Sequence, residues 1–159
     1  MSADFKQLTE FTKKIEKLND QQKEEFLESC CKELAARLLR KVIKRTPSDT
    51  GTLRRGWTTS STEDAKRDTK QAMYENLFGG NQKVSQKSME VRQVGDKYII
   101  DIINPVSYGS YVEYGNRTRD HKGWVNGHFM LTISEAELNR MSDAILQKKL
   151  NKFMKDVFT

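Results

Sequence analysis

The sequence predicts an α+β fold in which long helices at both ends of the chain pack on a small antiparallel β-sheet. Three features support this prediction: helically spaced apolar residues in the first third, a β-branched run near residue 100, and a second helical pattern that continues to the end. With 159 residues, the chain is long enough for one hydrophobic core and too short for two. We therefore expect a single domain spanning residues 1–159.

The first helical region covers residues 4–45. Asn19 and Asp20 interrupt it, and Asp20 is a suitable N-cap for a longer second helix. Because proline disfavours helical geometry in the preceding residue, Pro47 should end this helix at Thr46. The apolar residues recur at helical spacing: Phe5, Leu8, Phe11, Ile15, Leu18, Phe26, Leu27, Cys30, Leu34, Leu38, Val42 and Ile43.

The middle of the chain has strand-like composition at residues 56–61, 88–94 and 97–104. Residues 95–96, Gly-Asp, lie between the last two segments and suit a hairpin turn. The β-branched run that follows this turn should be buried. Pro105 should end the last strand, since proline cannot donate a ladder hydrogen bond.

A polar and charged excursion, Thr62 to Lys87, separates the first of these strands from the hairpin. Segments of this length inside small domains are usually functional or disordered. We expect the excursion to be a flexible arm or a contact with other subunits.

The last helical region begins after Ser134, which is the predicted cap, with Glu135 and Glu137 in the first turn. Its apolar residues lie on one broad face. Lysines at positions 148, 149, 152 and 155 complement the negative end of the helix dipole.

The composition favours polar contacts with other molecules. A net charge of +6 suits phosphates or acidic protein surfaces. No stacking-aromatic signature, Cys/His finger or tandem helix-turn-helix pattern accompanies this charge, so the sequence lacks a recognisable reader of bases. A solvated or ring-facing basic surface is therefore the favoured interpretation. A basic nucleic-acid-binding accessory protein is the alternative.

Targeting and redox signals are also informative. No basic region followed by an apolar run opens the sequence, and nothing approaches the roughly 20 apolar residues of a membrane span. We expect a protein of the cytosol, or of a particle assembled there, that contacts no membrane. Cys30 and Cys31 are adjacent within a helical pattern, where their side chains point in different directions, so a disulfide or metal site is not expected.

Two short motifs could suggest chemistry, but their context does not support it. Residues 49–51, Asp-Thr-Gly, resemble the triplet of aspartic proteases, yet they follow a turn instead of a buried strand. His121 and His128 are the only histidines, and no further ligands or catalytic partners converge on them. We interpret His128 as a local hydrogen-bonding residue. The sequence predicts no catalytic residue, no metal site and no cofactor.

Three segments in fixed order carry a family resemblance. A long helix ends in TPSDTGTLR followed by Gly-Trp, at residues 46–57; YGSYVEYG, at 108–115, follows a hairpin and Pro105; and GHFML, at 127–131, leads into the last helix. Together these segments resemble the Hong Kong 97-type head-to-tail connector family of tailed phages and phage-tail-like particles. Members of that family are called neck, tail-completion or minor capsid proteins. The resemblance covers most of residues 5–157.

The resemblance implies a non-enzymatic virion or tail-like-particle protein, assembled in the bacterial cytoplasm. Its copies would form a ring, usually a hexamer, between the portal or adaptor and the tail-terminator or tail-tube proteins. The ring would enclose a channel where side chains could meet DNA without sequence specificity. The chain departs from the commoner pattern in the 62–87 excursion and in an extra loop at residues 119–126.

The candidate interface residues lie in these three segments. Gly51 should adopt a backbone conformation closed to other residues at the corner after the first long helix, and a simple helix-to-strand turn is the alternative role for that corner. Tyrosines spaced three apart suit an interface, with core packing as the alternative. The full set is Asp49, Thr50, Gly51, Leu53, Arg54, Arg55, Tyr108, Tyr111, Glu113, Tyr114, His128 and Phe129.

Glu113 lies between Val112 and Tyr114, where a buried carboxylate would need a cationic or donor partner. Arg54 and Arg117 are the candidate cations, and Arg54 has the planar fork that binds a carboxylate through two bonds. We predict an Arg54–Glu113 pair, either within a subunit or across the ring.

Overall fold

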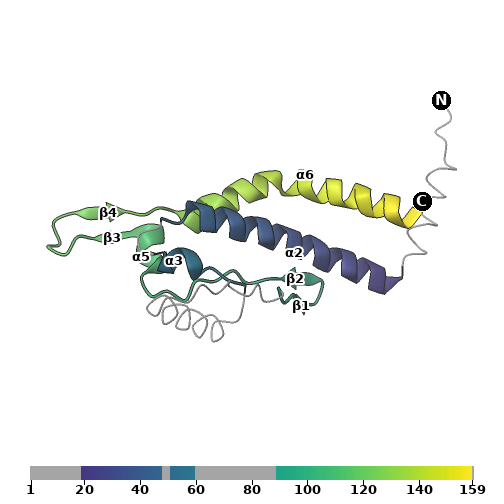
Figure 1. The fold of residues 1–159 in the computed structure, drawn as a ribbon, viewed down its shortest axis with the longest axis horizontal. Coiled ribbons are helices and arrows are strands. Elements are labelled where there is room, and N and C mark those ends of the chain that lie inside the picture. The colour runs from purple at the N-terminus through teal and green to yellow at the C-terminus, as the bar shows by residue number, and fades with distance from the viewer. Residues whose placement is uncertain (1–18, 48–50, 60–88, 159) are drawn as a thin grey trace, which may run out of the picture.

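The computed structural model describes residues 19–47, 51–59 and 89–158. Two long antiparallel helices lie side by side and form the body, with shorter elements along one side and at one end (Figure 1). The predicted α+β class is confirmed. The excursion at 62–87 and the helix before Asn19 lie outside the described residues. In chain order the elements are α2 (Asp20–Arg45), α3 (Thr52–Arg55), β1 (Arg92–Val94), β2 (Lys97–Ile99), α5 (Gly109–Tyr114), β3 (Gly115–Arg117), β4 (Trp124–Asn126) and α6 (Met130–Phe158).

Local sequence signals set both ends of α2. Asn19 caps the first turn, since its side-chain oxygen accepts from the Gln21 N–H at 3.4 Å, while the Gln22 side chain accepts from the Asn19 N–H at 3.3 Å. The cap is therefore one residue earlier than the predicted Asp20. The predicted exit at Thr46 is confirmed, because Thr46 is the C-cap and has extended backbone geometry before Pro47.

Contacts along their whole length hold α2 against α6. The rings of Phe26 and Phe153 stack with centroids 4.4 Å apart near the α2 N-terminus. Toward the other end, Glu137 accepts from Lys41 at 2.8 Å and from Arg45 at 2.6 Å. The antiparallel pair is thus fixed by an aromatic contact at one end and charged contacts at the other.

The start of α6 differs from the prediction. The helix begins at Met130, a full turn before the predicted cap Ser134. Ser134 is buried inside the first turn, where its hydroxyl donates to the Met130 carbonyl at 2.6 Å and accepts from Arg45 at 2.8 Å. The prediction was wrong because a distant residue, Glu113, caps this helix.

Two separate two-stranded antiparallel hairpins replace the single small sheet that the sequence suggested. The predicted turn at Gly95-Asp96 joins β1 to β2, with Gln93 opposite Tyr98, but both strands are only three residues long. The expected strand at 56–61 is reduced in the described residues to a bridge between Thr58 and Ile103. The β-branched run at 98–103 is half-buried, because the hairpin packs only one side against α2.

The β3–β4 hairpin was not predicted; the extra loop expected at residues 119–126 includes β4 but not β3. Asn116 lies opposite Val125, and the hairpin projects beyond the end of the helix pair (Figure 1). The opposite end of the molecule carries the α2 N-terminus and the α6 C-terminus (Figure 1).

A small hydrophobic core lies where α2 ends and α6 begins. Val42, Leu53 and Met130 are buried at its centre. Partly buried side chains surround them: Leu38, Trp57, Val106, Val112 and Leu131. The segments 46–57, 108–115 and 127–131, singled out in the sequence, therefore meet around one core.

Candidate subunit interface

The corner after α2 is an internal junction built on Thr46. The Thr46 side chain is fully buried; its hydroxyl donates to the Val42 carbonyl at 2.7 Å and accepts from the Trp57 indole N–H at 2.8 Å. The Arg54 guanidinium donates to the Thr46 carbonyl through Nε at 3.1 Å and Nη2 at 2.7 Å. Arg54 therefore closes the corner from inside the subunit.

Gly51 confirms the predicted backbone geometry, with a φ of 78° in the left-handed region. This glycine precedes α3, which inserts Leu53 into the core at 5% exposure. The Leu53 side chain therefore packs in the core of the single subunit, and its interface role stays a prediction. Arg55 is exposed at this corner, while Asp49 and Thr50 lie outside the described residues.

Glu113 is buried, at 6% exposure, and its carboxylate caps the N-terminus of α6. It accepts from the Leu131 N–H at 3.0 Å, the Thr132 N–H at 3.0 Å and the Thr132 hydroxyl at 2.7 Å. Burial alone would raise the pKa of this carboxyl, but the hydrogen bonds from Leu131 and Thr132 outweigh burial and lower the pKa. The group stays ionised and satisfies N–H groups that the helix itself cannot.

The predicted Arg54–Glu113 pair does not form within the subunit. Arg54 is engaged by the Thr46 carbonyl, and Glu113 by the first turn of α6. The sequence correctly indicated that Glu113 needs donors, but the donors are backbone N–H groups and a hydroxyl instead of a cation.

Three tyrosines form a stripe along α5 and its N-cap. Tyr108, Tyr111 and Tyr114 are 40%, 60% and 62% exposed. Their spacing of three residues places them along one side of a helical turn. The alternative of core packing is therefore wrong for these side chains, which remain on the surface of the subunit.

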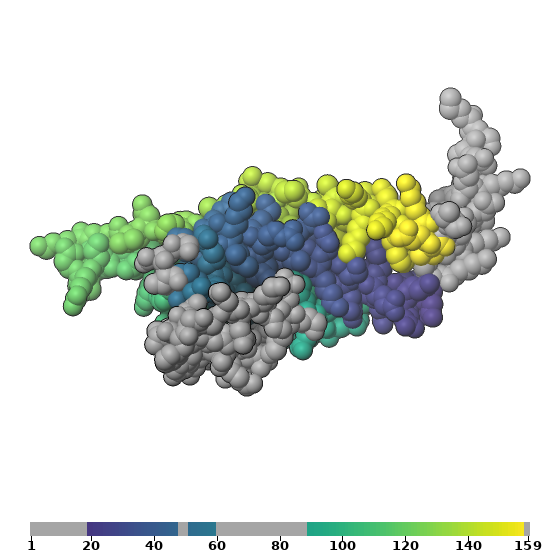
Figure 2. Space-filling view, viewed as in Figure 1, coloured from purple at the N-terminus to yellow at the C-terminus, as the bar shows by residue number. Residues whose placement is uncertain are grey.

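The β3–β4 hairpin extends this exposed aromatic surface. Trp124 and Val125 on β4 are 59% and 51% exposed, and Phe129 at the start of α6 is also exposed. We call the exposed side chains at this end the aromatic end: Tyr108, Tyr111, Tyr114, Trp124, Val125 and Phe129. In Figure 2 the hairpin, in green, extends past the neighbouring segments.

Close backbone contacts fix the base of the hairpin. A side chain on Gly115 would collide with the Val125 carbonyl, and one on Gly127 would collide with the Glu113 carbonyl. Two hydrogen bonds add to this junction, from the His128 N–H to the Val112 carbonyl at 2.8 Å and from the Phe129 N–H to the Glu113 carbonyl at 3.0 Å. The His128 main chain thus bonds to α5, far away in the sequence, and the role of its side chain stays a prediction. Gly115 and Gly127 were the available sequence signal for this hairpin.

The described residues contain no group of three His, Cys, Asp or Glu side chains able to hold a metal ion. Cys30 and Cys31 are free thiols, and burial raises the pKa of both. Across residues 19–47, 51–59 and 89–158, no helix is long and apolar enough to cross a membrane.

The described residues form a helix pair packed on itself, with exposed aromatic side chains gathered at one end. The model of the family described as "Bacteriophage HK97-gp10, putative tail-component" matches residues 9–115. The chain belongs to this HK97 gp10-like family of phage tail components. No curated protein and no solved structure shows significant similarity to it. The match includes the Thr46 corner and the tyrosine stripe, while β4 and α6 follow the matched segment.

Proposed function

We propose that the chain is a neck or tail-completion subunit. Its copies form a ring, a hexamer as is usual for head-to-tail connectors, which joins the portal or adaptor to the tail-terminator or tail-tube proteins. The ring encloses the DNA channel and acts structurally, without catalysis or a cofactor. Assembly takes place in the bacterial cytoplasm. The proposal rests on membership of a phage tail-component family and on the surface chemistry of the described residues.

The aromatic end is the observation that carries this proposal. Tyr111, Tyr114 and Trp124 each leave more than half of their surface uncovered in the single chain. Tyrosine and tryptophan are enriched at protein interfaces, because their rings bury large areas while their polar atoms keep hydrogen bonds. A cluster of such residues at one end is expected of a subunit that meets neighbours there.

The rest of the surface favours association only on a partner. The chain carries many charged residues, and its mean hydropathy is −0.77. The interfaces of permanent oligomers are larger and more apolar than such a surface can provide. The isolated protein is therefore expected to be monomeric or weakly associated and to close into a ring on the portal or tail. Sedimentation would contradict this expectation if it revealed a hexamer that survives dilution.

Particle assembly tests the proposed function directly. Tyr111→Ser combined with Tyr114→Ser removes two exposed rings and is expected to abolish ring formation and particle incorporation while leaving the monomer folded. Met141→Ser combined with Leu150→Ser removes two exposed apolar side chains of α6 outside the aromatic end; it is the control and should be incorporated normally. Normal incorporation of the double variant into particles would contradict the proposal that Tyr111 and Tyr114 belong to a subunit interface. Salt-sensitive duplex binding by a stable monomer that never enters particles would favour the nucleic-acid-binding alternative.

A further inference from the structure

The β3–β4 hairpin is held at its base and closed at its tip. A side chain on Gly115 or on Gly127 would collide with the backbone opposite, so the segments at the base lie in close contact. Toward the tip, the Thr118 N–H donates to the Gly123 carbonyl at 3.1 Å, and the Gly123 N–H donates to the Thr118 hydroxyl at 2.9 Å. The hairpin therefore projects from the helix pair as a narrow ribbon with a defined turn (Figure 1).

Three cations lie at the outer end of this ribbon. Arg117, Arg119 and Lys122 are exposed, and we call them the basic tip. None of the ion pairs among the described residues involves them. The positive charge of the basic tip is therefore available to a partner.

The one carboxylate beside the basic tip, Asp120, is bonded to its own turn. It accepts from the Thr118 hydroxyl at 2.5 Å and from the Lys122 N–H at 3.3 Å. These two hydrogen bonds lower the pKa of Asp120, so the group stays ionised and holds the turn. Three cations against one carboxylate leave an excess of two positive charges at the tip.

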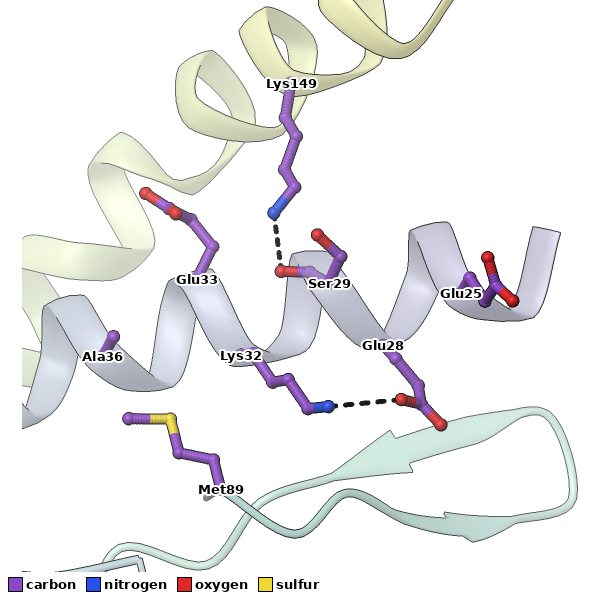
Figure 3. Close-up of a pocket in the computed structure, with 8 residues that line it drawn as sticks. All are labelled: Glu25, Glu28, Ser29, Lys32, Glu33, Ala36, Met89 and Lys149. Carbon is purple, nitrogen blue, oxygen red and sulfur yellow. Dashed lines mark hydrogen bonds and ion pairs between the residues drawn. The ribbon is translucent and has the colours of Figure 1, made fainter. Parts of the chain in front are cut away.

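Charges on the helix pair are balanced within the subunit, in contrast to those of the tip. A hollow of about 470 Å³ on α2 contains several carboxylates, but Glu28 pairs there with Lys32 at 3.4 Å (Figure 3). Glu33 pairs with Arg37 at 2.6 Å, and the Lys149 side chain extends from α6 into the same hollow (Figure 3). The hollow thus has its own counter-charges, whereas the basic tip has none beyond Asp120.

The chemistry of the tip favours a partner with regularly repeated negative charge. Beyond the paired Arg117 and Trp124, the turn at 118–123 contains no large apolar side chain. Interfaces between proteins have an apolar, aromatic-rich core from which charged residues are depleted, and the turn supplies no such core. A DNA duplex instead carries one phosphate charge per roughly 1.7 Å of its axis, and its major groove, about 12 Å wide, admits a two-stranded β-ribbon.

We propose that the basic tip contacts the phosphates of the DNA that passes through the ring. This assignment rests on the proposed ring function and adds the side chains that meet the DNA: Arg117, Arg119 and Lys122. The tyrosine stripe at the base of the hairpin contacts neighbouring copies, while the tip contacts the DNA. The contact is independent of base sequence, because phosphates carry no sequence information directly.

Binding of the full chain to a DNA duplex at varied salt concentration tests the contact. The tip variant replaces the three cations of the basic tip by glutamine: Arg117→Gln, Arg119→Gln and Lys122→Gln. The control variant makes the same charge change at exposed cations of the helix pair: Arg40→Gln, Lys44→Gln and Arg140→Gln.

The salt dependence of binding separates the two variants. Each phosphate contact contributes about −0.9 to the slope of log K against log salt, so the tip variant should reduce the magnitude of the slope by roughly 2 to 3. The loss should be the same for two duplexes of different sequence, and the control should keep the wild-type slope. Equal slopes for the tip and control variants would overturn the phosphate contact.

Photo-crosslinking in assembled particles distinguishes DNA from protein as the partner. A photo-reactive amino acid at His121, exposed on the same turn, should give products with DNA. Products with portal or tail proteins alone would overturn the proposal. The tip variant should still enter particles, because the tyrosine stripe is unchanged, and its exclusion would show that the tip serves assembly instead. If the ring function itself is wrong, the wild-type chain is absent from particles.

Discussion

The helix-pair body and the aromatic end use similar residue types in opposite ways. In the body, Phe26 stacks on Phe153 and Glu137 is paired with two cations, so aromatic and charged groups are satisfied within one chain. At the aromatic end, Tyr111, Tyr114 and Trp124 remain mostly exposed. Side chains that stabilise the monomer in one region are thus available for partners in the other.

The junction between these regions explains how both can exist in one small chain. Glu113 belongs to the helix that carries the tyrosine stripe, yet its carboxylate caps α6 of the body. The orientation of α5 and its exposed tyrosines is therefore coupled to the buried hydrogen bonds of the Glu113 carboxylate. Substitutions on either side of this junction should separate effects on stability from effects on assembly.

The largest stability effect is expected in the core. Leu53→Ala leaves a cavity beside Val42 and Met130 and should lower the free energy of unfolding by about 2–5 kcal/mol. Val125→Ala, on the exposed β3–β4 hairpin of the aromatic end, should change the free energy of unfolding by no more than about 0.5 kcal/mol. Urea denaturation of both variants measures the contrast. Equal losses of unfolding free energy in the two variants would contradict the distinction between the body and the aromatic end.

The next effect concerns the cap of α6. Glu113→Gln keeps the shape of the side chain but removes the charge that accepts three hydrogen bonds, and should cost about 1–3 kcal/mol. Glu135→Gln, an exposed acid on the same helix, is the matched control and should be nearly neutral. Chemical denaturation at neutral pH compares the two. If Glu113→Gln left the free energy of unfolding unchanged, the cap would contribute little to stability.

The same cap predicts a pH dependence. The folded protein lowers the pKa of Glu113, so its stabilisation is fully present above the unfolded value of about 4.3 and is lost as pH falls through the lower folded pKa. The stability difference between the wild type and Glu113→Gln should therefore shrink as the solution is acidified below about pH 4. Denaturation curves between neutral and acidic pH measure this trend, and a constant difference would argue against it.

A smaller effect is expected at the charged contact between α2 and α6. Hydrogen bonds from Lys41 and then Arg45 lower the pKa of Glu137, but the side chain is 37% exposed and its ion pairs are screened by salt. Glu137→Gln should lower the melting temperature less than Glu113→Gln does. Added salt should reduce the difference from the wild type. A salt-independent loss would point to packing instead of charge.

Features encoded by neighbouring residues could be predicted from sequence. Pro47 marks the end of α2, and residues 95–96 mark the β1–β2 turn. Each of these signals restricts the backbone conformation of the residues that carry it or of their immediate neighbours. Gly51 likewise adopts the expected left-handed geometry. Exposure of the three tyrosines was one of the two alternatives predicted, because their spacing of three residues is a local pattern that the sequence shows directly.

Features that depend on distant contacts could not be predicted. The start of α6 depends on Glu113, which is 17 positions before Met130 and contacts the helix only after folding. Arg54 was assigned to this carboxylate because charge suggests a pair, whereas the fold brings it to the Thr46 carbonyl. The β3–β4 hairpin was missed because its three-residue strands carry almost no β-branched pattern.

Hydroxyl-radical footprinting of the free chain and of assembled particles tests the central claim most directly, because it reads tyrosine and tryptophan side chains individually. Tyr108, Tyr111, Tyr114 and Trp124 should oxidise readily in the free chain and become protected in the particle. Phe26 and Phe153, stacked within the body, should change little between the two states. Equal oxidation of the four aromatic-end residues in both states would contradict the assignment of this end as the assembly surface.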